Sequence, residues 1–344
     1  MPSLKEIKGR INSISSTLAI TSAMKMVASA KLQKAQMAIQ NMLPYERRLH
    51  SMLIDLMGAV NMSAPASEEG SARLVSLSNQ PDHTESEGAY SLMAQRQVHR
   101  VAIVAFASNS SLCGAFNSNV IREATAVINE YRASGLGDAD ITVYSVGRKM
   151  AEAMRKLGFP SPADFTKMSD SPSYDAASAL AQELFDGFVS GRFDKVELVY
   201  NHYKSTSSQP TTRQTYLPLS LADATADIQV GKITDSASET DTNKVAEPVG
   251  APVVRQGSPT TEDLIVEPSK EALIATLLPK VIRLRIFTTL LDSAAAEHAA
   301  RTVAMQLATD NGNDLLQELT LEYNKGRQQK ITSEILDLVG GSLQ

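Results

Sequence analysis

A regular apolar stripe runs through the first 57 residues, with alternating spacings of three and four positions. Thirteen of its sixteen positions are apolar, and the spacing never slips. The positions are Leu4, Ile7, Ile11, Ile14, Leu18, Thr21, Lys25, Ala28, Leu32, Ala35, Ile39, Met42, Glu46, Leu49, Leu53 and Leu56. Such a seven-residue repeat gives a long helix one apolar seam, which another helix has to cover. At about 1.5 Å per residue the helix would reach roughly 80 Å. The pattern therefore predicts a rod and favours a protein that transmits or holds something over one that catalyses.

Thr21 and Lys25 are consecutive polar positions in this stripe. Polar residues at seam positions often set the register of a coiled coil. They could equally contact a molecule outside the helix pair, and spacing alone does not choose between the two interpretations.

A second long helix is predicted in the last part of the chain, beginning near Pro268. Its apolar positions continue through an alanine tract at 294–296, and small residues of this kind let two helix axes approach closely. Gly340 and Gly341 are expected to end the helix. Because each long helix needs a partner for its seam, we predict that the two pair with each other in antiparallel register.

Between the two long helices the pattern changes to short apolar runs that alternate with helical segments. This alternation indicates a mostly parallel sheet with helices on its faces. The predicted fold class is α/β, with a long antiparallel coiled coil of the N- and C-terminal helices and a central doubly wound domain. Strands are expected at 98–106, 141–146, 196–200 and 213–217, and helices at 115–133, 148–157 and 175–190.

Two polar stretches without sustained periodicity divide the chain. The first is interpreted as a variable insertion and the second as a linker. The predicted order begins with a coiled-coil helix at 1–59, the insertion at 60–97 and the α/β domain at 98–219. The linker at 220–262 and a second coiled-coil helix at 263–344 follow.

The charge is mild overall and uneven along the chain. A net charge of -5 argues against a general nucleic-acid binder. Residues 1–57 carry +5, from eight Lys and Arg against three Asp and Glu. A basic rod suggests an acidic protein partner, although a solvated polar face is the simpler interpretation of any single charge. No run of 18 apolar residues occurs, so we expect no membrane span.

No pattern of residues predicts a catalytic, cofactor or metal site. The sequence contains neither of the glycine-rich phosphate-binding motifs G-x-x-x-x-G-K-[ST] and G-x-G-x-x-G. A lone Gly114 after a predicted strand indicates an ordinary turn. The five histidines lack the spacing of metal ligands. Cys113 is the one cysteine, and without a supporting triad it is better explained as a buried structural residue than as a nucleophile. We therefore expect no cofactor and no metal.

Segments near both ends of the chain carry a longer signature. They are Ile20-Thr21-Ser22-Ala23-Met24-Lys25-Met26-Val27-Ala28, Ala300-Arg301-Thr302-Val303-Ala304-Met305, Ala308-Thr309-Asp310-Asn311 and Tyr323-Asn324-Lys325-Gly326-Arg327-Gln328-Gln329-Lys330-Ile331-Thr332-Ser333-Glu334, with Leu112-Cys113-Gly114 in the middle. Together they resemble the gamma subunit of F-type ATP synthases. The resemblance covers nearly the whole chain apart from 61–97 and 220–262.

The departures from the family pattern are local. The family usually has Asp and then Gly just before Leu-Cys-Gly, where this chain has Asn109, Ser110 and Ser111. This difference concerns the details of one turn. The plastid form carries a regulatory cysteine pair in the linker, and since 220–262 holds no cysteine we predict no dithiol switch.

The resemblance implies a mechanical, non-catalytic role. The paired helices would form the central stalk of a proton-translocating ATP synthase and turn inside a hexameric head of alpha and beta subunits. The α/β domain would sit at the foot, near the epsilon subunit and the membrane-embedded c-ring. The chain would thus associate peripherally with the cytoplasmic side of a bacterial inner membrane, couple rotation to nucleotide binding at the beta subunits, and regulate ATPase activity and proton flow.

The resemblance also implies which residues carry the coupling. The positions that match are Met24, Arg301, Gln328, Thr332 and Glu334, and Lys25 adjoins the first of them. We hypothesise that further basic residues, including Lys31 and Lys34, face acidic levers on the beta subunits.

Two other classes of protein stay open from the sequence. A freestanding coiled-coil adaptor with a small-molecule-binding α/β domain would need a ligand crevice at the carboxyl ends of the strands. An enzyme that uses Cys113 would lose turnover when this residue is replaced by alanine.

Overall fold

The computed structural model describes residues 3–62, 96–219 and 270–341. The insertion and the linker predicted at 60–97 and 220–262 therefore lie almost entirely outside the described residues. Within the described ranges, no helix is both long enough and apolar enough to cross a membrane.

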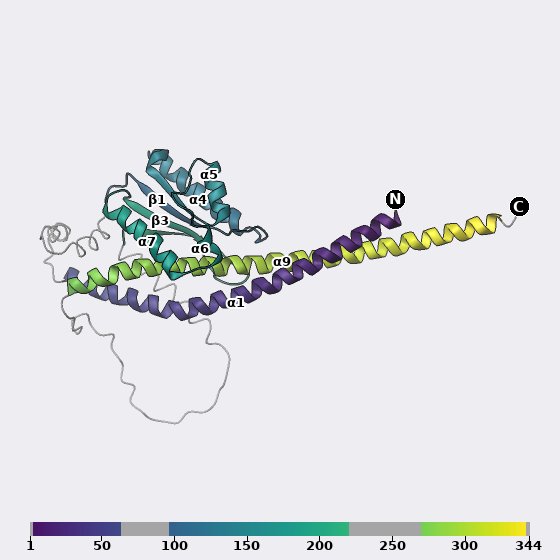
Figure 1. Ribbon diagram of the computed structural model, residues 1–344, viewed down its shortest axis with the longest axis horizontal. Helices are drawn as coiled ribbons and strands as arrows, with labels where there is room; N and C mark the ends of the chain where they lie inside the picture. The colour runs from purple at the N-terminus through teal and green to yellow at the C-terminus, as the bar shows by residue number, and fades with distance from the viewer. Residues whose placement is uncertain (1–2, 63–95, 220–269, 342–344) are drawn as a thin grey trace, which may run out of the picture.

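Two long helices, α1 (Leu4–Met62) and α9 (Lys270–Gly341), pack side by side as a coiled coil (Figure 1). Stripe residues such as Ala28, Leu32 and Leu53 are buried. Figure 1 shows the sheet domain against the first part of α9, and the last part of α9 extending beyond the beginning of α1 at the far end. The predicted pairing of the two ends of the chain is confirmed.

Glycines mark the antiparallel register of the coiled coil. Leu4 lies against Gly326 and Leu18 lies against Gly312, so 14 residues forward on α1 correspond to 14 residues backward on α9. A Cβ atom on Gly312 would come within 2.6 Å of Leu18 Cδ2. Glycine at this position thus leaves the space that the leucine side chain fills, and the two helices can approach closely.

The central sheet has the strand order β2-β1-β3-β4. Strands β1 (Val101–Phe106), β2 (Ile141–Val146) and β3 (Lys195–Asn201) are parallel, and β4 (Thr211–Leu217) runs antiparallel at one edge. Because β1 lies between β2 and β3, the two successive connections run in opposite directions and place helices on both faces. The predicted doubly wound, mostly parallel sheet is confirmed.

Successive residues of β1 face opposite sides of the sheet, as in any strand. Its odd-numbered residues pack with α4 (Phe116–Ala133) and α5 (Arg148–Lys156). Its even-numbered residues pack with α6 (Thr166–Asp170) and α7 (Tyr174–Val189). A short 3₁₀ helix, η2 (Asp138–Asp140), leads into β2.

The coiled coil shares a hydrophobic core with the sheet domain. Ile274, Leu278 and Ile282 of α9 are buried in the same cluster as the even-numbered residues of β1. Leu49 and Leu53 of α1 belong to this cluster as well. The coiled coil, from here on the shaft, is thus built into the domain at one end and projects from it at the other.

Candidate functional site along the shaft

Two polar residues in the α1 stripe meet polar residues of α9. The hydroxyl groups of Thr21 and Thr309 lie 3.2 Å apart, and the Thr288 hydroxyl donates to Glu46 Oε1 at 3.1 Å. Polar pairs of this kind fix the register of a coiled coil. The structure therefore supports the register-setting interpretation for Thr21, while Lys25 is only half-buried and the question stays open for it.

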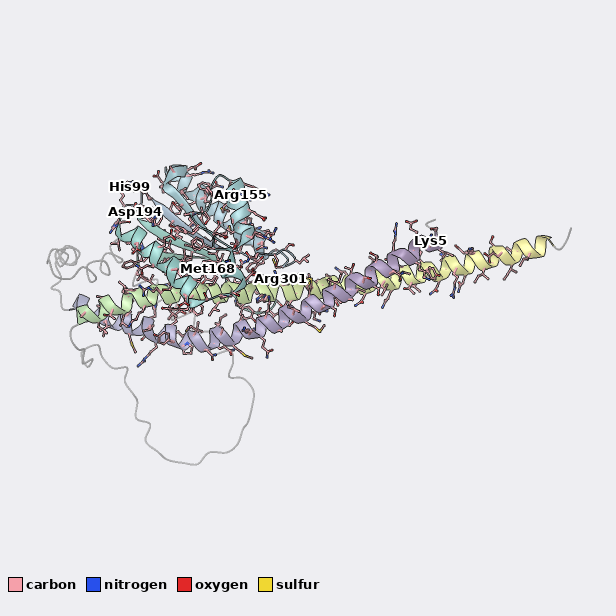
Figure 2. All side chains as sticks on the ribbon, in the orientation of Figure 1. Lys5, His99, Arg155, Met168, Asp194 and Arg301 are labelled. Carbon is pink, nitrogen blue, oxygen red and sulfur yellow. The ribbon has the colours of Figure 1, made fainter. Side chains whose placement is uncertain are left out.

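Arg301 links the shaft to the sheet domain. Its guanidinium donates to Glu297 Oε1 on α9 and to Ser110 Oγ in the loop after β1, both at 2.7 Å. Figure 2 shows Arg301 where the sheet domain meets α9. Burial raises the pKa of the Glu297 carboxyl, and the positive charge of Arg301 partly offsets this effect. Arg301 therefore has a role within the chain, and its contact with the head stays a prediction.

Asn117, in the first turn of α4, holds the turn that departs from the family pattern. Asn117 accepts a hydrogen bond from the Ser108 amide at 3.0 Å and donates one to the Ser110 carbonyl at 3.2 Å. Leu112 has a positive φ of 68°, which a residue with a side chain adopts only under constraint. The turn thus presents the Ser110 hydroxyl to the shaft, where Arg301 binds it.

Cys113 occupies a structural position. It is 1% exposed and packs with Phe116 and with Ala296 of α9. Asn117 Nδ2 donates to its sulfur at 3.2 Å, and the Ser108 hydroxyl lies 3.8 Å away. Both polar neighbours are neutral and neither can act as a general base, so this geometry gives no support to an enzyme that uses Cys113.

The carboxyl ends of the parallel strands face the shaft, which occupies the place of a ligand crevice. Phe106 of β1 and Val146 of β2 line a cavity together with Leu290, Ser293 and Ala294 of α9. The volume of this cavity is only about 10 Å³, room for one water molecule at most. In the part of the chain that the structure describes, this edge of the sheet offers no small-molecule site of the kind that an adaptor would need.

Lys31 and Lys34 are both exposed on α1. Burial lowers the pKa of His298 to about 4, with further contributions from the positive charges of Arg301 and Lys31. Lys31 is therefore close enough to the junction with the sheet domain to act within the chain. Lys34 is the cleaner probe of a contact with another subunit.

The remaining predicted residues lie on a part of α9 that extends past the beginning of α1 (Figure 1). Gln328, Thr332 and Glu334 are exposed there. So are the apolar side chains of Ile331 and Ile335, which are 48% and 54% exposed. This end of α9, from here on the tip, consists of one helix with no described α1 residue opposite it.

The predicted site residues are spread along the shaft instead of forming one cluster. Four lie on α1, one lies at the junction with the sheet domain and three lie on the tip: Met24, Lys25, Lys31 and Lys34; Arg301; and Gln328, Thr332 and Glu334. Their roles in coupling stay predictions.

Sequence reasoning missed two polar clusters. Glu197 of β3 is buried and binds Lys195, Arg213 and Tyr131. A single acid inside the apolar run of β3 was a usable signal for this cluster. The second cluster joins Asp292 of α9 to His202, just after β3 and 90 positions earlier in the chain. No local sequence pattern predicts this contact.

Comparisons with known proteins agree with this architecture. Residues 3–343 match the ATP synthase family. The chain is 48% identical to the ATP synthase gamma chain of Phocaeicola vulgatus and 46% identical to that of Bacteroides thetaiotaomicron, in each case over 100% of both chains. A chain in the structure of the Euglena gracilis mitochondrial ATP synthase has a similar fold, with a TM-score of 0.54 at 18% identity over 99% of this chain and 93% of that one. The family match and the full-length relatives show that this chain belongs to the ATP synthase gamma chain family.

Proposed function

We propose that this chain is the central-stalk rotor subunit of a proton-translocating F-type ATP synthase, and that it carries no catalytic site of its own. The observation that supports this most directly is the form of the shaft. It is built into the sheet domain at one end and continues as a single helix at the other (Figure 1). A body of this form can carry rotation from its base to its tip.

The proposed mechanism is differential contact. The two helices of the shaft differ in sequence, so the shaft presents a different face to each beta subunit around it. A binding partner shifts an equilibrium only through its difference in affinity for the two states, so each face favours a different nucleotide-binding conformation. Rotation of the c-ring would then step each beta subunit through these conformations, and the same contacts would regulate ATPase activity and proton flow.

The proposed partners follow from this placement. The sheet domain would form the foot of the stalk, next to the epsilon subunit and the c-ring, and the far end of the shaft would lie inside the head of alpha and beta subunits. The complex would hold the chain peripherally at the cytoplasmic side of a bacterial inner membrane.

Capture of the chain from detergent-solubilised membranes with an antibody against it tests this proposal. We expect alpha, beta, epsilon and c subunits in fixed proportions, and ATP-driven proton pumping after reconstitution into vesicles. Recovery of a free homodimer that lacks these partners would contradict the rotor.

Charge reversal at Lys34 combined with charge removal at Lys31 tests the proposed contact with the beta subunits. Exposed ion pairs contribute about 0–1 kcal/mol each, so the loss of two pairs in Lys34→Glu with Lys31→Gln is expected to lower gradient-driven ATP synthesis by up to roughly thirtyfold. Glutamine is used at Lys31 because a negative charge there would also repel Glu297, whose carboxyl senses the Lys31 charge. The matched control is Lys31→Gln with Lys34→Gln, and equal synthesis rates in both variants and the wild type would exclude acidic levers as partners.

A further inference from the structure

Asp292 of α9 holds the end of strand β3 with both of its carboxylate oxygens. Oδ2 lies 2.6 Å from Nδ1 of His202, and Oδ1 accepts a hydrogen bond from the Tyr203 amide at 2.9 Å. The Asp292 side chain is 17% exposed. The carboxylate therefore binds two successive residues of the sheet domain in a largely enclosed position.

Tyr203 extends this contact to the second helix of the shaft. Its hydroxyl accepts a hydrogen bond from Gln36 Nε2 of α1 at 2.6 Å. Its ring packs against the cluster that Leu32 of α1 forms with Ala295 and Ala299 of α9. One side chain at the end of β3 thus touches both helices of the shaft, and Asp292 fixes the backbone that carries it.

The charges around His202 favour its protonated form. The hydrogen bond to Asp292 raises the pKa of His202 most strongly, burial lowers it, the Asp292 charge raises it further, and Lys204 in the same loop opposes this. The net direction is upward from the ordinary value of 6.5. Gln36, which binds the Tyr203 hydroxyl from α1, is neutral.

We propose that Asp292 is the positioning residue that holds the sheet domain against both helices of the shaft, and that His202 makes this hold weaken as the pH rises. A group whose folded-state pKa is raised contributes its stabilisation in full below the unfolded value and loses it as the pH rises through the folded value. The stabilisation that the contact between His202 and Asp292 contributes is thus complete below pH 6.5 and declines above it. Its importance for coupling rests on the proposed rotor function, because a foot that turns with the shaft must not slip against it.

Hydrogen exchange of the Tyr203 amide in the assembled complex tests the hold directly, since this amide is the group that Asp292 Oδ1 binds. The complex is compared at about pH 6 and about pH 8.5, on either side of the ordinary range of histidine titration, with correction for the intrinsic rise of exchange with pH. We expect the wild type to lose protection of the peptide that contains Tyr203 at the higher pH. His202→Lys should stay protected at both values, because lysine keeps its charge.

Two further variants separate the parts of this proposal. Asp292→Asn keeps an acceptor for the Tyr203 amide but removes the charge. At pH 6, protection of this amide from exchange should therefore be lower in the variant than in the wild type. Between pH 6 and pH 8.5, the variant should not show the loss of protection that the wild type shows. His99→Lys is the control, since Figure 2 shows His99 on the side of the sheet domain away from the shaft, and it should behave as the wild type. Equal losses of protection in the wild type and His202→Lys would overturn the role of His202, and protection at pH 6 in Asp292→Asn equal to that of the wild type would overturn the role of the Asp292 charge.

The ratio of protons pumped to ATP hydrolysed gives the functional readout. In the wild type this ratio should fall relative to that of His202→Lys as the pH rises. A pH-dependent loss of protection with no change in this ratio would confirm the hold but contradict its importance for coupling. If the complex with partner subunits fails to form at all, the rotor proposal fails, whereas the hold can still be measured on the full-length chain.

Discussion

Replacing Glu197 with alanine is expected to lower the free energy of unfolding of the full-length chain by about 3–5 kcal/mol, the cost of removing one partner from a buried ion pair. The carboxylate side chain is 2% exposed and binds Lys195 at 2.6 Å and Arg213 at 2.7 Å. It also accepts a hydrogen bond from the Tyr131 hydroxyl at 2.6 Å. Alanine would leave Lys195 without its counter-charge and Arg213 with only the exposed carboxylate of Glu130. Urea unfolding followed by circular dichroism measures the loss.

Glu130→Ala is the matched control for this change. Glu130 also binds Arg213, but its side chain is 64% exposed. Ion pairs at such exposure contribute about 0–1 kcal/mol, so the control should unfold near the wild-type urea concentration. If the two variants unfolded at the same urea concentration, the buried cluster around Glu197 would not be a major source of stability.

The same carboxyl predicts a pH dependence of stability. Burial on its own would raise the pKa of Glu197, but hydrogen bonds from Arg213, Lys195 and Tyr131 outweigh burial and hold the pKa below its ordinary value of 4.5. A group with a depressed folded-state pKa stabilises the fold above its unfolded value and loses this contribution as the pH falls through the folded value. The difference in unfolding free energy between the wild type and Glu197→Gln should therefore be complete above pH 4.5 and shrink below it.

Gly147→Ala is expected to cost about 3 kcal/mol or more, because backbone strain and a steric clash add at one position. Gly147 connects β2 to α5 with a φ of 95°, a conformation that glycine adopts far more readily than other residues. A Cβ atom there would lie 2.1 Å from the carbonyl oxygen of Ala107. This backbone is held in place, since the Ala107 amide donates to the Val146 carbonyl at 2.8 Å. The same urea experiment measures the effect.

Gly158→Ala separates the two contributions. Gly158 has a similar φ of 91°, but a Cβ atom there would meet no atom within 4 Å. This control should show the cost of the backbone conformation alone, about 1 kcal/mol. Equal losses at Gly147 and Gly158 would mean that the end of β1 moves to relieve the clash.

Strand β2 illustrates how much of the sheet could be predicted. Its six residues are mostly β-branched or aromatic, and Gly147 ends the run. The predicted range 141–146 agrees with the structure. The strand predicted at 98–106 begins only at Val101, because the His99 and Arg100 amides donate to the Asp194 carboxylate and not to a neighbouring strand. Helix α6 was missed because five residues are too few to show a helical period.

The contacts of the shaft could be predicted only in part. The stripe shows which α1 residues face a partner helix. The pattern of one helix does not show which residues of the partner helix lie opposite them. The pairing of Glu46 with Thr288 and of Arg301 with Ser110 therefore needed the structure. Resemblance to a family selects positions such as Gln328, but the structure of one chain holds no other subunit against which a role in coupling could be tested.

The thickness of the shaft has a mechanical consequence. Beside the sheet domain the two helices belong to a shared core, and farther along they form a coiled coil. Past Gly326, α9 is the one helix among the residues that the structure describes. The bending stiffness of a rod rises steeply with its cross-section, so compliance increases in steps from the foot to the tip. Elastic deformation under load would therefore concentrate in the thin end, while the base responds as a rigid body.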